Sequence, residues 1–205
     1  QRTVLILVAV IALILGLVVA KVLRQPPLDS KQLAHLGVFL KDPSTQIDSF
    51  ELTAHDGSAF TNADLVGKWH VLFFGFTHCP DICPVTLAQI AQVKQQLDAT
   101  LGQKEVQYVL VSVDPARDTP ERLREYVSYF DSEFLGVTGP LQNIYDFAIG
   151  LNVIFAKVPQ DSGDYLIDHS ANLVLLDPDG KYHGFLKTPH KTDNIVTALS
   201  AIIDQ

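Results

Sequence analysis

The chain of 205 residues is 47% hydrophobic and carries a formal net charge of −8 at pH 7. All 23 acidic residues follow residue 28, together with 12 of the 15 basic residues, so this part has a net charge of −11. Such a balance excludes nucleic acid as a partner. The length gives room for one domain with a sizeable core, in addition to the apolar segment at the front of the chain.

The first predicted element is a membrane-spanning helix over residues 3–20, TVLILVAVIALILGLVVA, which carry no charge. A helix of that length spans about 27 Å, close to the ~30 Å hydrocarbon core of a bilayer. A cleaved signal segment is the alternative, since Val18 and Ala20 suit a signal peptidase, but signal peptides usually have apolar regions of only about 7–15 residues. We therefore expect residues 1–24 to form a single-pass membrane anchor.

The orientation of this helix follows from two considerations. Arg2 precedes the helix while Lys21 and Arg24 follow it, and this count alone would place the domain in the cytoplasm. Long domains, however, cross membranes largely regardless of loop charge, and because the chain contains no methionine we expect further residues before Gln1. No Arg- and Ser-rich mitochondrial presequence is visible, so we expect a bacterial inner membrane with the domain in the periplasm.

The segment after the anchor, residues 25–46, mixes prolines, polar residues and short apolar pairs. It shows no sustained period of 2 or 3.6 and is predicted to be a tether lying over the domain. The domain itself is predicted to span residues 47–205 and to begin with a hairpin. Its strands are expected at 48–53 and around Ala59 and Phe60, because these stretches flank the turn sequence HDG.

Buried strands then alternate with helices. The apolar runs WHVLFFGF at 69–76 and VQYVLVSVD at 106–114 predict two buried strands. Between them, from Pro84 onward, apolar residues recur at helical spacing. After the second strand, Asp118 or Thr119 is predicted to cap another helix, with a proline near its first position.

The rest of the domain predicts a helix at about 140–149, then a hairpin formed by ANLVLLD and KYHGFL around the turn PDG, and a last helix over NIVTALSAII. A β-α-β-α order followed by a hairpin and a helix implies an α/β sandwich with a mixed central sheet flanked by helices. This is the order expected of a thioredoxin-like fold.

The two cysteines of the chain, Cys79 and Cys83, lie in FTHCPDICP, where a buried strand is predicted to end and a helix to begin. The N–H groups and dipole of a helix N-terminus favour the thiolate and lower a pKa that is about 8.5 in a free cysteine. A structural disulfide and two inert thiols are the alternatives, but such a disulfide would close a loop too short to add much stability. The pair therefore predicts either disulfide exchange or a soft metal site.

A third ligand would distinguish these two chemistries. The chain has seven histidines, and no two form an HxH or HxxxH pair. His169 differs from the rest because it directly precedes a predicted central strand, and in a thioredoxin-like fold that loop lies beside the cysteine turn. Asp168 and Asp81 are candidates for orienting ligands, although turns and helix starts favour Asp in any case. His78, next to the first cysteine, is a weaker substitute ligand.

The motifs FFGFTHCPDICP, VSVDPARDTP, YLIDHS and DPDG, preceded by DG, FT and GK, occur in order over residues 48–180 and resemble the Sco/SenC family of copper-binding assembly proteins. The resemblance implies a domain outside the cytoplasm that binds one copper ion, as Cu(I) or Cu(II), through Cys79, Cys83 and His169. It also implies a role in maturing the dinuclear copper site of cytochrome c oxidase subunit II. Another periplasmic copper chaperone and a thiol reductase are further implied partners.

Several alternatives remain beside this resemblance. Within the family, the protein could donate copper, reduce the cysteines of subunit II, do both, or act as a redox or copper sensor. Zinc also accepts two cysteines and a histidine, but soft thiolates favour Cu(I) and the imidazole can retain Cu(II). A thiol–disulfide oxidoreductase or peroxidase is disfavoured by the CxxxC spacing and the absence of a proline beside Ser170. We therefore expect a metallochaperone rather than an enzyme.

Overall fold

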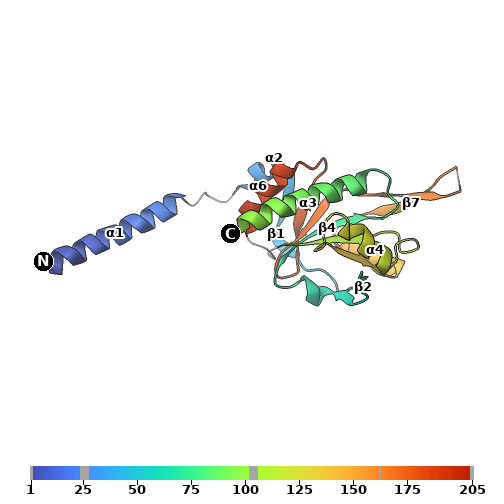
Figure 1. The fold of residues 1–205 in the computed structure, drawn as a ribbon, viewed down its shortest axis with the longest axis horizontal. Coiled ribbons are helices and arrows are strands. Elements are labelled where there is room, and N and C mark those ends of the chain that lie inside the picture. Colours follow the sequence, from blue (N-terminus) through green and yellow to red (C-terminus); the bar gives the residue numbers. More distant parts are fainter. Residues whose placement is uncertain (1, 24–27, 102–105, 162, 204–205) are drawn as a thin grey trace.

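The computed structural model describes residues 2–23, 28–101, 106–161 and 163–203. Within them, an eight-stranded mixed sheet has the strand order β1-β10-β9-β4-β5-β6-β2-β3 (Figure 1). Its strands are β1 (Val38–Thr45), β2 (Glu51–Ala54), β3 (Ala59–Thr61), β4 (Trp69–Gly75), β5 (Val106–Ser112), β6 (Leu135–Thr138), β9 (Leu173–Leu176) and β10 (Tyr182–Leu186). The helices are α1 (Arg2–Leu23), α2 (Ser30–His35), the 3-10 helix η1 (Asn62–Leu65), α3 (Ile82–Leu101), α4 (Pro120–Ser128), α5 (Leu141–Gly150) and α6 (Thr192–Ile203).

The middle of the sheet is both parallel and antiparallel. Strand β4 pairs with β5 in parallel, from Trp69 opposite Val106 to Gly75 opposite Ser112, and β5 pairs with β6 in parallel. On its other side β4 pairs with β9 antiparallel. The parallel pairs need crossover connections, which α3 and α4 supply, whereas β9 and β10 are joined by a short turn. The α/β sandwich with a mixed sheet that the sequence predicts is therefore confirmed.

Strand β4 lies at the centre of the core. All its residues except Trp69 are buried, and β9 is buried throughout. Helices α3 and α6 pack together on one side of the sheet and α4 lies on the other (Figure 1). Because helices cover both faces, the strand sequence is a continuous apolar run rather than an alternating one. The end of β4, where the cysteine turn begins, is thereby fixed in the core.

Several element boundaries agree with the sequence predictions. Strands β2 and β3 form the predicted hairpin, and Pro84 lies in the first turn of α3. Of the two candidate caps for α4, Thr119 is the N-cap, because its hydroxyl accepts a hydrogen bond from the Arg122 N–H at 3.3 Å. Asp118 has a different role, at the cysteine turn.

The segment predicted to be a tether contains regular structure instead. Helix α2 starts with a reciprocal capping box, in which Asp29 and Gln32 each accept a hydrogen bond from the backbone N–H of the other. Strand β1 then joins the sheet by pairing antiparallel with β10. Both elements have sequence signals, an Asp three residues before a Gln and the run VFL, but these are short. The ordered domain thus begins before residue 47.

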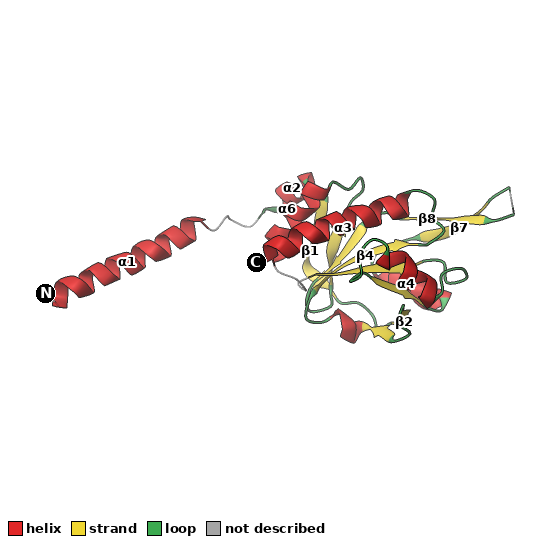
Figure 2. Ribbon diagram, in the orientation of Figure 1, coloured by secondary structure: helices red, strands yellow, loops and turns green. Residues whose placement is uncertain are grey.

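One hairpin of the structure was not predicted. Strands β7 (Phe155–Pro159) and β8 (Tyr165–His169) pair with Phe155 opposite His169 and form a separate two-stranded sheet. Figure 2 shows this hairpin projecting beyond the eight-stranded sheet. Its strands, FAKVP and YLIDH, interrupt their apolar residues with lysine, proline, aspartate and histidine, so no clear period of 2 is visible in the sequence. We refer to residues 155–169 as the projecting hairpin.

The predicted membrane anchor has a mixed outcome. Residues 3–20 are helical, within α1. In the part of the chain that the structure describes, however, no helix has both the length and the apolar character needed to cross a membrane. The prediction of a transmembrane anchor is therefore not supported.

Candidate metal centre

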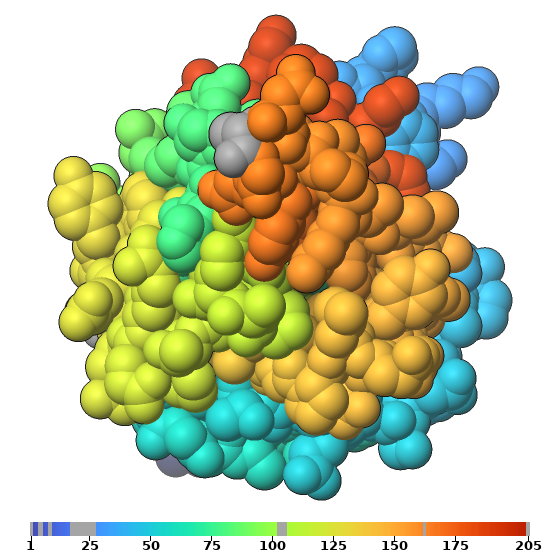
Figure 3. Space-filling model, turned by 90° about the vertical axis from the view of Figure 1, so that its right-hand side faces the viewer, coloured from blue at the N-terminus to red at the C-terminus, as the bar shows by residue number. Residues whose placement is uncertain are grey.

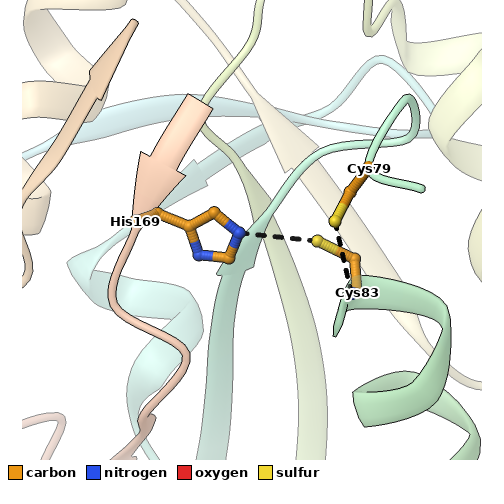
Figure 4. Close-up of side chains that lie close together, drawn as sticks. All are labelled: Cys79, Cys83 and His169. Atoms are coloured by element: carbon orange, nitrogen blue, oxygen red, sulfur yellow. Dashed lines mark hydrogen bonds between the residues drawn. The ribbon is translucent and has the colours of Figure 1, made fainter. Parts of the chain in front are cut away.

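The cysteine turn connects the end of β4 to the start of α3. Cys83 occupies the first turn of α3 and is 0% exposed, whereas Cys79 lies on the preceding loop and is partly exposed (Figure 4). Both thiols are free. The Cys83 backbone N–H donates to the Cys79 sulfur at 3.4 Å. The helix N-terminus therefore directs a backbone donor at Cys79, as the sequence predicts.

Gly75, the last residue of β4, makes room for the buried sulfur. A Cβ atom at this position would lie 3.0 Å from the Cys83 Sγ and 2.9 Å from a ring carbon of Phe73. Such distances are shorter than ordinary van der Waals contact, and the Phe73 ring is itself fully buried. The strand must therefore end in glycine for Cys83 to pack directly against its backbone.

His169 approaches the cysteines from the end of β8. Its Nε2 lies 3.5 Å from the Cys83 Sγ, and its Nδ1 lies 3.1 Å from the Ser170 carbonyl oxygen (Figure 4). Because a carbonyl only accepts, Nδ1 donates to Ser170, and Nε2 is the ring atom that faces the cysteine sulfurs. Phe73 and Phe76 hold the ring by edge contacts, with centroid separations of 5.9 and 6.0 Å.

The ligand atoms of Cys79, Cys83 and His169 all lie within 4.8 Å of one another. Sulfur and nitrogen ligands about 2.0–2.3 Å from a bound ion lie roughly 3.5–4 Å from each other. The three side chains thus need only a small inward movement to share an ion. The structure brings together two soft sulfur donors and one imidazole nitrogen, the three residues singled out in the sequence.

The two thiols have opposite pKa shifts. The pKa of Cys79 is lowered to about 4, mainly by the hydrogen bond from the Cys83 thiol, with further help from His169 and from the backbone N–H groups of Asp81 and Cys83. The pKa of Cys83 is raised, because its proton is shared with Cys79 and because it is buried. The metal-free pair therefore holds one thiolate and one thiol at neutral pH.

A buried carboxylate accepts hydrogen bonds from the loop that contains the cysteine turn. Asp118 is 0% exposed and accepts hydrogen bonds from the Thr77 N–H at 3.0 Å, the Thr77 hydroxyl at 2.6 Å and the Ser112 hydroxyl at 2.7 Å. Arg122 donates from Nε to the Thr77 hydroxyl at 2.8 Å. The turn is therefore held two residues before Cys79. Sequence reasoning treated Asp118 only as a cap, although it lies in the motif VSVDPARDTP.

Three further candidates from the sequence lie outside this cluster. Asp81 is exposed and contributes its backbone N–H rather than its carboxylate to Cys79. Asp168 is exposed and, as the neighbour of His169 in β8, points to the opposite face of the strand. The Nδ1 of His78 lies 3.2 Å from the Thr77 hydroxyl and 3.7 Å from the Asp118 carboxylate, so its ring faces that support.

The mixed sheet, with two cysteines where a central strand meets a helix, defines a thioredoxin-like protein whose site has gained a histidine from a projecting hairpin. Comparison with known families gives the same result in more detail. The SCO1/SenC family model matches residues 40–204. The chain belongs to the SCO1/SenC family.

Individual relatives agree with this assignment. The chain is 38% identical, over 84% of each sequence, to a Stutzerimonas stutzeri protein described as a putative copper-binding protein. The crystal structure of Arabidopsis thaliana ScoI with copper bound is 35% identical and matches with a TM-score of 0.72, covering 77% of this chain and 98% of that one. BsSco, described as a member of the Sco family of cytochrome c oxidase assembly proteins with a disulfide switch, is 25% identical with a TM-score of 0.61, over 77% of this chain and 94% of that one.

The relatives differ in length. This chain spans 84% of the Stutzerimonas protein but only 46% to 62% of the mitochondrial SCO1 and SCO2 homologues from plant, cattle, human and mouse. These matches cover 71% to 92% of this chain.

Proposed function

We propose that this protein is a copper metallochaperone that binds one copper ion per chain through Cys79, Cys83 and His169. The observation that carries the proposal is the convergence of two sulfur atoms and one imidazole nitrogen within 4.8 Å. Thiolates favour Cu(I), and an added imidazole allows the same site to retain Cu(II). The donor set therefore suits a protein that carries copper in either oxidation state.

The exposure of the site supports transfer rather than storage. Cys83 is buried, but Cys79 and His169 are partly exposed. Three protein ligands leave a position at which a ligand from a partner can enter before the donor's own ligands release the ion. Zinc fits the same three ligands, and competition between zinc and copper for the reduced protein tests the preference directly.

We further propose that the recipient is cytochrome c oxidase subunit II, whose dinuclear copper site would receive the ion. The support is family membership together with the description of BsSco as a cytochrome c oxidase assembly protein. Another periplasmic copper chaperone as the source of copper, and a thiol reductase that keeps the cysteines reduced, complete the proposed set of partners.

Metal analysis tests the binding part of the proposal. Protein comprising residues 30–205, reduced and then loaded with Cu(I) under anaerobic conditions, should retain one copper ion per chain after gel filtration. Zinc retained in preference to copper, or no metal retained, would contradict the copper assignment. In cells grown with limiting copper, His169→Ala should lose most oxidase assembly.

A thiol–disulfide oxidoreductase is the second candidate, and the opposite pKa shifts of the two cysteines favour it. A thiolate at Cys79 beside the Cys83 thiol is the arrangement that attacks a disulfide. In this case the protein would keep the copper-ligand cysteines of subunit II reduced, or sense the redox state. Thiol exchange does not require an imidazole ligand, so a His169→Ala variant that assembles oxidase as well as wild type, while the cysteine variants do not, would favour reduction over copper donation.

Single-pass attachment to a bacterial inner membrane and a periplasmic location stay predictions of the sequence. A reporter that is active only outside the cytoplasm, fused to the C-terminus, should be active. Activity of a reporter that works only inside the cytoplasm would contradict the location.

A further inference from the structure

The projecting hairpin is attached to the loop after β5 by a buried hydrogen-bond cluster. The Tyr165 hydroxyl, at the start of β8, donates to the Asp114 carboxylate at 2.7 Å, and Asp114 is 0% exposed. Arg117 donates to the same carboxylate through Nε and reaches the Asp164 carboxylate of the hairpin through Nη1 at 3.1 Å. Figure 3 shows the lime residues after β5 lying against the orange residues of the hairpin.

Aromatic stacking continues this attachment toward the metal centre. The Arg117 guanidinium carbon lies 3.9 Å from the centre of the Tyr165 ring and 5.8 Å from the centre of the Phe76 ring. Phe76 in turn makes an edge contact with His169. Arg117 therefore packs at once on the start of β8 and on the ring that holds the imidazole.

The same cluster is linked by hydrogen bonds to Asp118, the residue that holds the cysteine turn. The Asp114 N–H donates to the Ser112 hydroxyl at 3.1 Å, and that hydroxyl donates to Asp118, which holds Thr77. A single chain of hydrogen bonds thus runs from Tyr165, four residues before His169, to Thr77, two residues before Cys79. The hairpin side of the metal centre is thus held by Asp114 and the cysteine side by Asp118, and Ser112 contacts both of these buried residues.

The hairpin has few other means of fixing its own position. In β7 and β8 only Phe155 and Ile167 are buried, and the strands pair with each other rather than with the main sheet. Two apolar anchors leave a two-stranded hairpin weakly constrained. The hydroxyl of Tyr165 is the point at which the hairpin contacts a fully buried, charged acceptor.

We propose that Tyr165, Asp114 and Arg117 are positioning residues that hold the hairpin at the distance at which His169 reaches Cys79 and Cys83. Loss of this contact should move the imidazole away from the sulfurs without altering the cysteine turn. The proposal deepens the copper-binding function proposed above and rests on it only for the role of His169 as a ligand. The position of the ring is itself measurable in the metal-free protein.

The first test uses NMR of the reduced, metal-free protein. In Tyr165→Phe, the cross-relaxation peaks between the His169 ring and the rings of Phe73 and Phe76 should weaken at least several-fold. Tyr108→Phe is the matched control, because it removes a buried hydroxyl that has no hydrogen-bond partner in the described structure. Unchanged peaks in Tyr165→Phe would overturn the proposal, whether or not the protein binds copper.

The second test uses Cu(II) alone as the probe. Substitutions that disturb the support of a metal ligand typically lower affinity about 10- to 100-fold, so Tyr165→Phe should bind Cu(II) about 10-fold more weakly and show weaker thiolate-to-copper absorption. Tyr108→Phe should match wild type. Wild-type Cu(II) affinity in Tyr165→Phe would contradict the proposal, whereas a wild-type protein that binds no copper would contradict the proposed function and leave the NMR test to decide the positioning role.

A second variant covers the case in which Tyr165→Phe does not fold. Asp164 is exposed, so Asp164→Ala should fold while it removes the ion pair between Arg117 and the hairpin. Its effects on the ring contacts and on Cu(II) affinity should have the same direction and be smaller. Wild-type behaviour in both measurements would remove this ion pair from the proposal and, together with an unfolded Tyr165→Phe, would count against it.

Discussion

The cysteine turn and the projecting hairpin contribute to one site but differ in how they are held. The turn follows β4, the buried central strand, and rests on the fully buried carboxylate of Asp118. The projecting hairpin is largely exposed, and Tyr165 and Asp164, next to its turn, contact Asp114 and Arg117. Two of the three proposed ligands therefore belong to the core of the domain, and the third belongs to the projecting hairpin.

In the proposed copper site, this difference would allow the ion to be both held and released. Two sulfurs on the cysteine turn would keep Cu(I) bound, while His169 on the projecting hairpin would be withdrawn at the loss of a single bond. A partner that moves the hairpin would weaken the site without unfolding the core. The predictions below separate the contributions of the two regions.

Loss of a core ligand should have the largest effect. Cys83→Ala and Cys79→Ala should each reduce copper retention from one ion per chain to none, because a single thiolate and an imidazole do not form a tight Cu(I) site. Metal analysis after gel filtration measures this. His78→Ala, which changes a neighbour whose ring faces Thr77 and Asp118, is the control and should retain copper. Full retention in both cysteine variants would place the site elsewhere.

Removal of the buried charge under the turn should destabilise the fold. Asp118→Asn replaces an acceptor of three hydrogen bonds by a group with two donors, and hydrogen bonds to a charged group contribute about 1.5–3 kcal/mol each. We expect the free energy of unfolding in urea to fall by about 2–4 kcal/mol. Asp168→Asn on the exposed face of the hairpin should change it by less than about 0.5 kcal/mol. Equal effects of the two substitutions would contradict the difference in how the cysteine turn and the projecting hairpin are held.

A further prediction concerns the pH dependence of the cysteine turn. The pKa of Cys79 is lowered to about 4 in the folded protein, against about 8.5 for a free cysteine, so the thiolate stabilises the reduced fold fully above pH ~8.5 and this contribution is lost as the pH falls through about 4. Alkylation of the metal-free protein should modify Cys79 alone, with a midpoint near pH 4.

A matched variant identifies the cause of that midpoint. Cys83→Ala removes the thiol donor that contributes most to the lowered pKa of Cys79, so the alkylation midpoint should rise. A midpoint near pH 8.5 in the intact protein would show that the turn does not stabilise the thiolate, and no change in the variant would show that the Cys83 thiol is not the main cause of the lowered pKa.

The sequence predicted the core region well because its signals are local. The run WHVLFFGF indicates a buried strand, the CxxxC spacing indicates a reactive pair of cysteines, and Pro84 indicates the start of a helix. These three signals lie within a few residues of one another. Thr119 was among the predicted caps for the same reason. The prediction of His169 rested on its place before a central strand and on the resemblance to the Sco/SenC family, and the structure places its imidazole beside the cysteines.

The hairpin and the supporting network could not be predicted in this way. Strands β7 and β8 were not recognised, because apolar residues such as Val158 and Leu166 occupy exposed positions and obscure the period of 2. Asp114 and Tyr165 are 51 residues apart in the chain, and their contact depends on how the hairpin folds back. Asp118 was interpreted from its immediate neighbours, whereas its partner Thr77 is 41 residues away. Long-range polar contacts of this kind leave no periodic pattern in a sequence.

X-ray absorption at the copper edge tests the central claim most directly. This claim is that the cysteine turn supplies two sulfur ligands and that the projecting hairpin supplies one imidazole ligand. The Cu(I)-loaded protein should show two sulfur neighbours together with the outer-shell scattering of one imidazole ring. His169→Ala should keep both sulfurs and lose the imidazole scattering. Imidazole scattering that persists in His169→Ala, or fewer than two sulfurs in the wild-type protein, would contradict the account.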